Sequence, residues 1–296
     1  MSKKLRGTFT VMITPYDDLG NVDLKALADF TEWQIREGIH GLIPLGSTGE
    51  FLSLSQDERD SVAETVIRVT AGRVPVLIGT GAEDTREALR LSREAEQMGA
   101  DGVMIIPPYY STPTHDELYH HYKTVADGIS IPIMVYNNPA TTNVDLTPDI
   151  VARIATIDGC DYIKESTMDV TRIRDILELS GGQISVFGGI MGFESFVEGA
   201  EGWVAVASNC APGQMARIFE LVADEGRVFD ARALYLKWLP IIRAVGGQKY
   251  VAGTKSLLTH MGFHAGRPRP PRLPLDAEQD AKMKHIIEQS GLKFQL

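Results

Sequence analysis

Short apolar runs alternate with longer amphipathic stretches along most of the chain. Eight such runs, rich in β-branched residues, occur at 8–15, 41–46, 74–81, 101–108, 131–138, 160–166, 183–189 and 202–208. Most are apolar without a break rather than at every second position. This pattern is typical of parallel strands that are covered on both faces.

The stretches between these runs have helical periodicity and helix start signals. The clearest start lies at Ser55 and Glu58, which form the Ser-x-x-Glu pattern of a capping box, and this helix is expected to close at Gly72. Further helices are predicted within 22–38, 83–100, 114–128 and 146–159. The chain therefore reads as repeated strand–helix units.

Eight such units with no linker between them predict an α/β protein, a (β/α)8 TIM barrel, over residues 1–225. Residues 226–296 contain further helical segments and a proline-rich connector at 266–275, which predict a C-terminal helical extension. A doubly wound open sheet is the alternative. It fits less well, because the evenly spaced units lack a Rossmann glycine fingerprint.

Composition narrows the class of partner. The 296 residues are 44% apolar and 23% charged, and their net charge of −10 disfavours nucleic acid and membrane surfaces as partners. A small acid could still bind at a local positive site. Cys160 and Cys210 lie in apolar runs and are expected to be buried thiols of a reducing compartment. Residues 1–15 lack an apolar stretch long enough for a signal peptide, which indicates a cytoplasmic protein.

In a (β/α)8 barrel the active site forms where the strands end, so the polar residues at those ends are the candidates. Lys164, after the sixth predicted strand, is the one cation among them. A desolvated lysine with a lowered pKa can attack a carbonyl carbon and form an imine. Tyr136, on the neighbouring strand, could move the protons that imine formation requires. Ser47 and Thr48, with the N–H groups of the turn that begins at Gly46, could hold a substrate carboxylate.

Each of these residues also has an ordinary structural interpretation. A lysine near a strand end is often solvated or ion-paired, a tyrosine is often a core residue with its hydroxyl at the rim, and GSTGE (46–50) could be a plain turn. Their joint position at three strand ends of one barrel favours catalysis.

Four motifs in the same order resemble the dihydrodipicolinate synthase / N-acetylneuraminate lyase family of Schiff-base aldolases and lyases. They are GSTGEFLSLSQDER (46–59), PPYYSTPTHDELYHHYK (107–123), VYNNPATTNV (135–144) and YIKES (162–166). The resemblance implies that Lys164 forms an imine with pyruvate or another 2-oxo acid and that Tyr136 is the acid–base group. It makes Ser47 and Thr48 the carboxylate-binding and relay hydroxyls.

The resemblance also implies a subunit arrangement and further site residues. Tyr110 matches a tyrosine that crosses a subunit interface, the backbone carbonyl of Val204 is expected to line the site, and Gly188 leaves room for substrate. A homotetramer, built as a dimer of dimers, is expected. We expect no metal or organic cofactor, since the iminium itself is the electron sink.

Two departures from the family pattern bear on the substrate. Thr141 stands where true dihydrodipicolinate synthases carry an arginine that holds the second substrate's carboxylate, and a hydroxyl does not replace a bidentate clamp. The acidic pair that sialic-acid lyases carry after the seventh strand is absent. Phe51, directly after GSTGE, is similar to the residue that catabolic members of the family carry at this position. We therefore expect an aldolase, dehydratase or deaminase acting on a 4-substituted 2-oxo acid or its cyclic imine. A synthase that condenses pyruvate with aspartate semialdehyde is the alternative.

Three other functions stay open at the level of sequence. A metal-dependent aldolase is disfavoured because His115, His120, His121 and His285 are predicted on helices, with the His120–His121 pair on a helix surface. A phosphosugar enzyme would bind phosphate at the turn 187–192, but no lysine or arginine follows it directly. A barrel that binds 2-oxo acids without turnover is the third.

Overall fold

The computed structural model describes residues 5–296, which divide into two compact units. One unit consists of residues 5–7 and 77–204, the other of residues 8–76 and 205–296. The start of the chain, on which part of the signal-peptide prediction rests, lies outside the described residues at 1–4.

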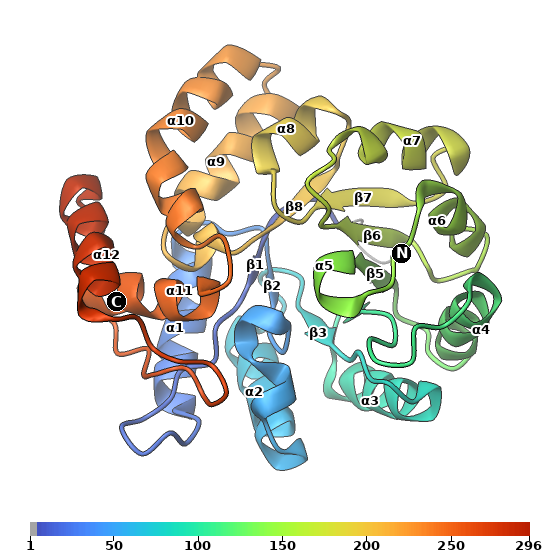
Figure 1. Ribbon diagram of the computed structural model, residues 1–296, viewed down its shortest axis with the longest axis horizontal. Coiled ribbons are helices and arrows are strands. Elements are labelled where there is room, and N and C mark those ends of the chain that lie inside the picture. Colours follow the sequence, from blue (N-terminus) through green and yellow to red (C-terminus); the bar gives the residue numbers. More distant parts are fainter. Residues whose placement is uncertain (1–4) are drawn as a thin grey trace. The chain divides into compact units, whose positions relative to one another are not determined.

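The unit around residues 77–204 is a parallel sheet with helices between its strands. Strands β3 to β8 follow one another in chain order, each parallel to the next. The strands are β3 Leu77–Gly79, β4 Gly102–Ile105, β5 Ile133–Asn137, β6 Tyr162–Glu165, β7 Ser185–Gly188 and β8 Gly202–Ala205. The helices are α3 Thr85–Met98, α4 His115–Ala126, α5 Pro139–Thr142, α6 Pro148–Ile154, α7 Thr171–Leu179 and α8 Gly192–Val197. In Figure 1, α3, α4, α6 and α7 lie on the outer side of these strands.

The other unit holds the first two strands and the C-terminal helices. Strand β1 (Gly7–Val11) pairs in parallel with β2 (Gly41–Ile43), and Phe9 lies opposite Gly41. A Cβ at Gly41 would overlap the Phe9 ring, so this pairing needs a glycine. The helices are α1 Leu24–Arg36, α2 Gln56–Thr70, α9 Pro212–Ala223, α10 Val228–Ala244, α11 Tyr250–His260 and α12 Ala277–Ser290. Three single-turn 3-10 helices are η1 Ser47–Gly49, η2 Phe51–Ser53 and η3 Ala207–Asn209.

Local signals placed the elements well. Helix α2 starts with the predicted capping box, in which Ser55 Oγ accepts the Glu58 N–H at 3.3 Å and Glu58 accepts the Ser55 N–H at 2.9 Å. Ala71 and Gly72 then take the left-handed backbone conformation that ends the helix. Every residue of β5 and β6 is buried, including Lys164 and Glu165 at the end of β6.

The predicted fold class is confirmed. Eight parallel strands, each with its helix or helices, make an α/β protein of the (β/α)8 TIM-barrel class, and α10, α11 and α12 form the C-terminal helical extension. The predicted boundary at 225/226 falls between α9 and α10, and a division of domains there stays a prediction. Among residues 5–296, no helix is both long and apolar enough to span a membrane.

One surface prediction is wrong. His120 is exposed, but His121 is buried with 4% exposure, because α4 turns positions 118, 121, 122 and 125 inward at helical spacing. The His121 Nδ1 lies 2.9 Å from the Thr85 hydroxyl, and burial lowers the pKa of His121 to about 4. The two cysteines, by contrast, are free and buried as predicted.

Candidate active site

Lys164 and Tyr136 lie side by side at the ends of two neighbouring strands. They are paired in register between β6 and β5, so both side chains point to the same face of the sheet. Each residue is 5% exposed. The Lys164 Nζ lies 3.8 Å from the centre of the Tyr136 ring, and within residues 5–296 no carboxylate forms an ion pair with it. A buried amine is thus held against a phenol without a neutralising anion.

The surroundings of the Tyr136 hydroxyl favour its ionised form. Burial alone would raise the pKa of Tyr136, but the charge of the nearby Lys164, the hydrogen bond from Asn138 and the polar groups of Lys164 and Ser166 close to the phenol together outweigh burial and lower it. Asn138 Nδ2 donates to the phenol oxygen at 3.0 Å. A hydroxyl that already accepts a hydrogen bond can direct its own proton elsewhere, as an acid–base group must.

Next to this pair, Ser166 places a hydroxyl without a hydrogen-bond partner in residues 5–296. Its Oγ is buried and has no hydrogen-bond partner among the described residues, although it lies near enough to the Tyr136 hydroxyl to help lower that pKa. A Cβ built at Gly189, just after β7, would lie 2.8 Å from the Ser166 Cβ and closer still to its Oγ. The position of Ser166 therefore depends on the glycine at 189.

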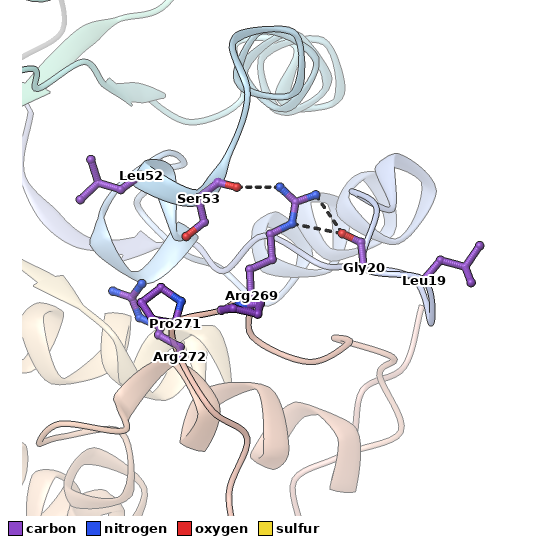
Figure 2. Close-up of a pocket in the computed structure, with 8 residues that line it drawn as sticks. Leu19, Gly20, Leu52, Ser53, Arg269, Pro271 and Arg272 are labelled. Atoms are coloured by element: carbon purple, nitrogen blue, oxygen red, sulfur yellow. Dashed lines mark hydrogen bonds between the residues drawn. The ribbon is translucent and has the colours of Figure 1, made fainter.

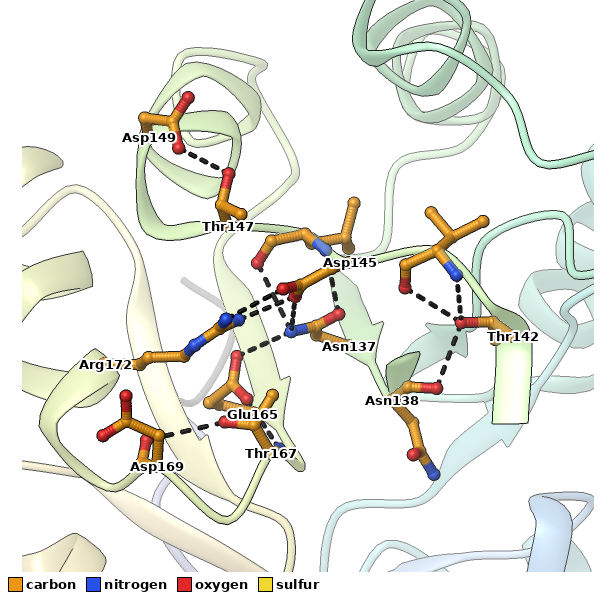
Figure 3. A network of polar contacts seen from close by, with 12 residues as sticks. Asn137, Asn138, Thr142, Asp145, Thr147, Asp149, Glu165, Thr167, Asp169 and Arg172 are labelled. Atoms are coloured by element: carbon orange, nitrogen blue, oxygen red, sulfur yellow. Dashed lines mark hydrogen bonds and ion pairs between the residues drawn. The ribbon is translucent and has the colours of Figure 1, made fainter. Parts of the chain in front are cut away.

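The opposite face of the same two strands carries a polar frame, drawn in Figure 3. Asn137 and Glu165 alternate with Tyr136 and Lys164, and Asn137 Nδ2 donates to a Glu165 carboxylate oxygen at 2.9 Å. Asn137 Oδ1 accepts the Leu146 N–H at 3.0 Å. This contact ties the loop after β5 to the strand pair. The frame therefore fixes the register that brings Lys164 beside Tyr136.

Two more side chains extend this frame into the loops. Glu165 accepts the Thr167 N–H at 2.7 Å, so it holds the start of the loop after β6. Arg172 binds both carboxylate oxygens of Asp145 at 2.7 and 2.8 Å, and Asp145 also accepts a hydrogen bond from Asn137 at 3.3 Å (Figure 3). The guanidinium of Arg172 is thereby committed to a structural ion pair.

Tyr110 lies on a loop that one carboxylate organises. Glu83 accepts the backbone N–H groups of Tyr109, Tyr110 and Ser111 at 2.8, 3.1 and 2.8 Å. Burial opposes the charge on Glu83, but hydrogen bonds from residues 109–111 more than offset it and lower the pKa of the carboxyl. The Tyr110 residue itself is 89% exposed.

The other predicted residues of this unit lie at strand ends or in loops. Thr141 is exposed in α5, and its hydroxyl donates to the Asn138 carbonyl at 3.2 Å. Gly188 ends β7 directly opposite Glu165, and Val204 is fully buried in β8. Gly188 is thus the last residue of β7 and Val204 lies inside β8, and the roles assigned to these residues stay predictions.

Gly46, Ser47 and Thr48 lie in the other unit, in the loop that follows β2. The turn Ser47–Gly49 is a 3-10 helix that follows Gly46; Ser47 is half-buried and Thr48 is 2% exposed. The Thr14 hydroxyl, from the segment after β1, donates to the Gly49 carbonyl at 2.8 Å. This contact fixes the end of a turn that carries two hydroxyls, those of Ser47 and Thr48.

Sequence reasoning missed several groups. Asn138 and Ser166 stand beside the predicted pair, but nothing in their local sequence marks a role. The structure also contains a second buried lysine, Lys255, whose Nζ lies 3.8 Å from the centre of the Tyr16 ring. Unlike Lys164 it has an anionic partner, since Glu50 Oε1 lies 3.0 Å away. In residues 5–296 no three His, Cys, Asp or Glu side chains gather so as to hold a metal ion.

Comparison with known proteins gives consistent matches over nearly the whole chain. The model of the dihydrodipicolinate synthetase family matches residues 4–290. The chain is 36% identical to the 4-hydroxy-tetrahydrodipicolinate synthase of Pelobacter propionicus and 35% identical to that of Syntrophus aciditrophicus, each over 97% of this chain and 99% of the relative. The crystal structure of a chloride-inhibited dihydrodipicolinate synthase from Acinetobacter baumannii complexed with pyruvate superimposes with a TM-score of 0.94. Its sequence is 31% identical over 98% of this chain and 100% of that one.

Proposed function

Since the chain belongs to the dihydrodipicolinate synthetase family of class I aldolase-type lyases, we propose that Lys164 is its imine-forming amine. The substrate we propose is a 4-substituted 2-oxo acid or its cyclic imine. One observation carries this proposal: the Lys164 Nζ is buried 3.8 Å from the Tyr136 ring, with no carboxylate of the described residues paired to it. An amine in this setting is suited to attack a carbonyl carbon.

The chemistry follows from that amine. Lys164 attacks C2 of the 2-oxo acid, the carbonyl oxygen takes a proton, and loss of water gives an iminium. In the cleavage branch the C4 hydroxyl loses its proton, C4 leaves as a carbonyl compound as the C3–C4 bond breaks, and the remaining enamine is protonated at C3. In the elimination branch C3 loses a proton, and the enamine so formed expels the C4 substituent, with its electron pair, to leave an unsaturated iminium. In both branches water then hydrolyses the imine and frees Lys164. No redox partner is required, because the electron pair stays within the substrate and the imine.

Tyr136 is the group we propose for the proton transfers at the carbinolamine. The contact with Asn138 leaves the phenol proton free to point at substrate oxygen. Its lowered pKa makes the phenol a better acid than an ordinary tyrosine, and its phenolate is stabilised by Lys164. Residues with this role contribute about 10²- to 10⁴-fold to rate.

For the substrate carboxylate we propose the turn from Gly46 to Thr48. The turn carries two hydroxyls, which can donate to an anion, and Thr48 is shielded from water. Gly188 and the Val204 carbonyl remain the proposed neighbours of the substrate after β7 and on β8. The proposed relay from Ser47 would be completed by Tyr110 of another subunit, and a side chain with 89% exposure is free to take that part.

Substrate choice depends on the loop after β5. Thr141 presents a hydroxyl there, and Arg172, the arginine after β6, is already bound to Asp145. The unpartnered Ser166 hydroxyl favours a substrate with a polar group on the carbons beyond C2. We therefore prefer cleavage, dehydration or deamination of a small polar 2-oxo acid.

The synthase reaction is the second candidate, and the comparisons favour it. The curated relatives that match at about 35% identity carry that name. Supplying pyruvate and aspartate semialdehyde tests it directly. We expect turnover at least about 100-fold slower than for an authentic synthase assayed alongside, because loss of a charged, bidentate contact costs about 3 kcal/mol or more. A turnover rate equal to that of the authentic synthase would show that the biosynthetic reaction is the function.

The decisive experiment traps the imine. The protein is incubated with pyruvate and borohydride, and the adduct is mapped by mass spectrometry. We expect a single adduct on Lys164, none in Lys164→Arg, and an unchanged adduct in Lys237→Arg, an exposed lysine of α10. An active Lys164→Arg enzyme would refute the assignment. Trapping without turnover of any 2-oxo acid would instead favour a barrel that binds without reacting.

We also infer a homotetramer in the cytoplasm, with a small 2-oxo acid as substrate, without nucleic-acid or membrane partners and without a cofactor. The exposed Tyr110 supports assembly, and two buried free thiols suit a reducing compartment. Sedimentation at several protein concentrations tests the tetramer. A species that stays monomeric and fully active would show that Tyr110 needs no second subunit.

A further inference from the structure

A buried cluster of charges lies in the unit formed by residues 8–76 and 205–296. Lys255 of α11 and Glu50 form an ion pair of 3.0 Å, and their side chains are only 2% and 0% exposed. The Lys255 Nζ also contacts the Tyr16 ring at 3.8 Å, and the Arg269 guanidinium lies 4.6 Å from the centre of that ring. Burial lowers the pKa of Lys255 to about 8 although Glu50 opposes this shift. None of these groups has a part in the imine chemistry.

Glu50 is the residue that directly follows the turn Ser47–Gly49. It has φ 57° and ψ 35°, a left-handed conformation that is costly for a residue with a side chain, and its N–H donates to the Ser47 carbonyl at 3.2 Å. Leu45, on the other side of the turn, is left-handed as well, with φ 59°. The turn is thus bracketed by two strained residues, which persist only if their surroundings hold them.

Residues of the C-terminal extension make the contacts that hold Glu50 in this conformation. Besides the ion pair with Lys255, Glu50 Oε2 accepts the backbone N–H of Arg269, in the connector between α11 and α12, at 2.8 Å. The Arg269 guanidinium donates to the carbonyls of Ser53 and Gly20, both at 2.8 Å (Figure 2). It also forms an ion pair with Glu58 at the start of α2. Arg269 also lines the surface depression drawn in Figure 2, and its guanidinium is used there for these contacts within the protein.

We propose that Glu50 and Lys255 are positioning residues, through which the C-terminal extension holds the Ser47–Thr48 turn in the conformation that binds the substrate carboxylate. This inference rests on the proposed function of that turn. Loss of the pair should weaken binding of the 2-oxo acid, while the reactivity of Lys164 toward bound substrate is retained. Lys255 itself forms no imine, because its amine is held by a carboxylate.

The test separates binding from reaction. Borohydride trapping is followed at increasing pyruvate for Glu50→Gln, Lys255→Met and the double variant. Lys249→Met, an exposed lysine just before α11, is the matched control. We expect the pyruvate concentration for half-maximal trapping to rise at least about 10-fold in the three cluster variants, with the maximal rate within about threefold of wild type. The control should not change.

Stability is measured on the same samples. The single variants leave one buried charge unpaired and can fail to fold, whereas the double variant removes both charges in side chains of similar size. It therefore decides the question. A folded double variant with wild-type half-saturation would overturn the proposal, as would an adduct mapped to Lys255. Absence of any adduct on Lys164 in the wild-type protein would refute the proposed function instead, so the two failures are distinguishable.

Discussion

Replacing Gly189 by alanine should distort the site next to Lys164. The new Cβ would lie 2.8 Å from the Ser166 Cβ and 3.0 Å from the Glu165 carbonyl oxygen. Carbon atoms in contact are normally about 3.5–4.0 Å apart, so the end of β6 must retreat by roughly 0.7 Å or more. Gly189 has no left-handed φ, so this substitution tests space and not backbone strain.

The effect of Gly189→Ala can be estimated both for the folding free energy and for the reaction rate. Overpacking of this kind costs about 1–3 kcal/mol of folding free energy. Misplacement of a reacting group by about 1 Å costs on the order of 10²-fold in rate. Since Lys164 lies two residues before Ser166, we expect imine trapping with pyruvate to slow roughly 10- to 100-fold. Urea unfolding should show the loss of stability.

A compensating substitution at Ser166 tests whether the clash with Ser166 causes this loss. Ser166→Gly removes the Cβ and Oγ that the new methyl would strike, so Gly189→Ala/Ser166→Gly should recover most of the trapping rate. Pyruvate has no carbon beyond C3, and using it keeps any role of Ser166 in substrate choice out of the measurement. Gly246→Ala, in an exposed turn where the nearest atom is 3.3 Å from the new Cβ, should behave as wild type. Wild-type behaviour of Gly189→Ala, or no recovery in the double variant, would refute the packing described for β6 and β7.

Three further predictions concern the groups around this site. Tyr136→Phe should lower kcat about 10²- to 10⁴-fold, and a smaller loss than tenfold in steady-state assays would exclude it as the main acid–base group. Asn138→Leu removes a donor that lowers the pKa of Tyr136, so the fall of activity at alkaline pH should move to higher pH, and an acid shift in the pH–rate profile would contradict this. His121 is held neutral with a pKa of about 4 against 6.5 when unfolded; the unfolded chain therefore binds the extra proton, and about 3 kcal/mol of stability should be lost as pH falls from 6.5 to 4. Urea titrations of wild type and His121→Phe at pH 7 and 4.5 measure this, and equal losses in both would exclude His121 as the cause.

The order of elements was predictable because each depends on local sequence. Unbroken apolar runs mark buried parallel strands, and the pair Ser55–Glu58 marks a helix start without reference to the rest of the chain. The barrel rule then placed Lys164 and Tyr136 at adjacent strand ends, and their register in the structure agrees.

Contacts between distant segments were not predictable in this way. Glu50 and Lys255 are far apart in sequence, and neither has a neighbour that indicates an ion pair. The burial of the Ser166 hydroxyl beside Gly189 depends on the packing of β6 against β7, which the local sequence does not indicate. His121 was misplaced because its polarity suggested a surface, whereas the helical spacing of Leu118, Tyr122 and Val125 put it on the inner face.

The two-residue repeat of β5 and β6 separates reactive and anchoring side chains onto opposite faces, Tyr136 and Lys164 on one and Asn137 and Glu165 on the other. Laboratory evolution of new acceptors could therefore diversify Thr141 and its neighbours freely while the anchors keep the amine in place. Libraries that spare residues 137 and 165 should retain many more active clones than libraries that randomise them, even though neither residue faces the amine.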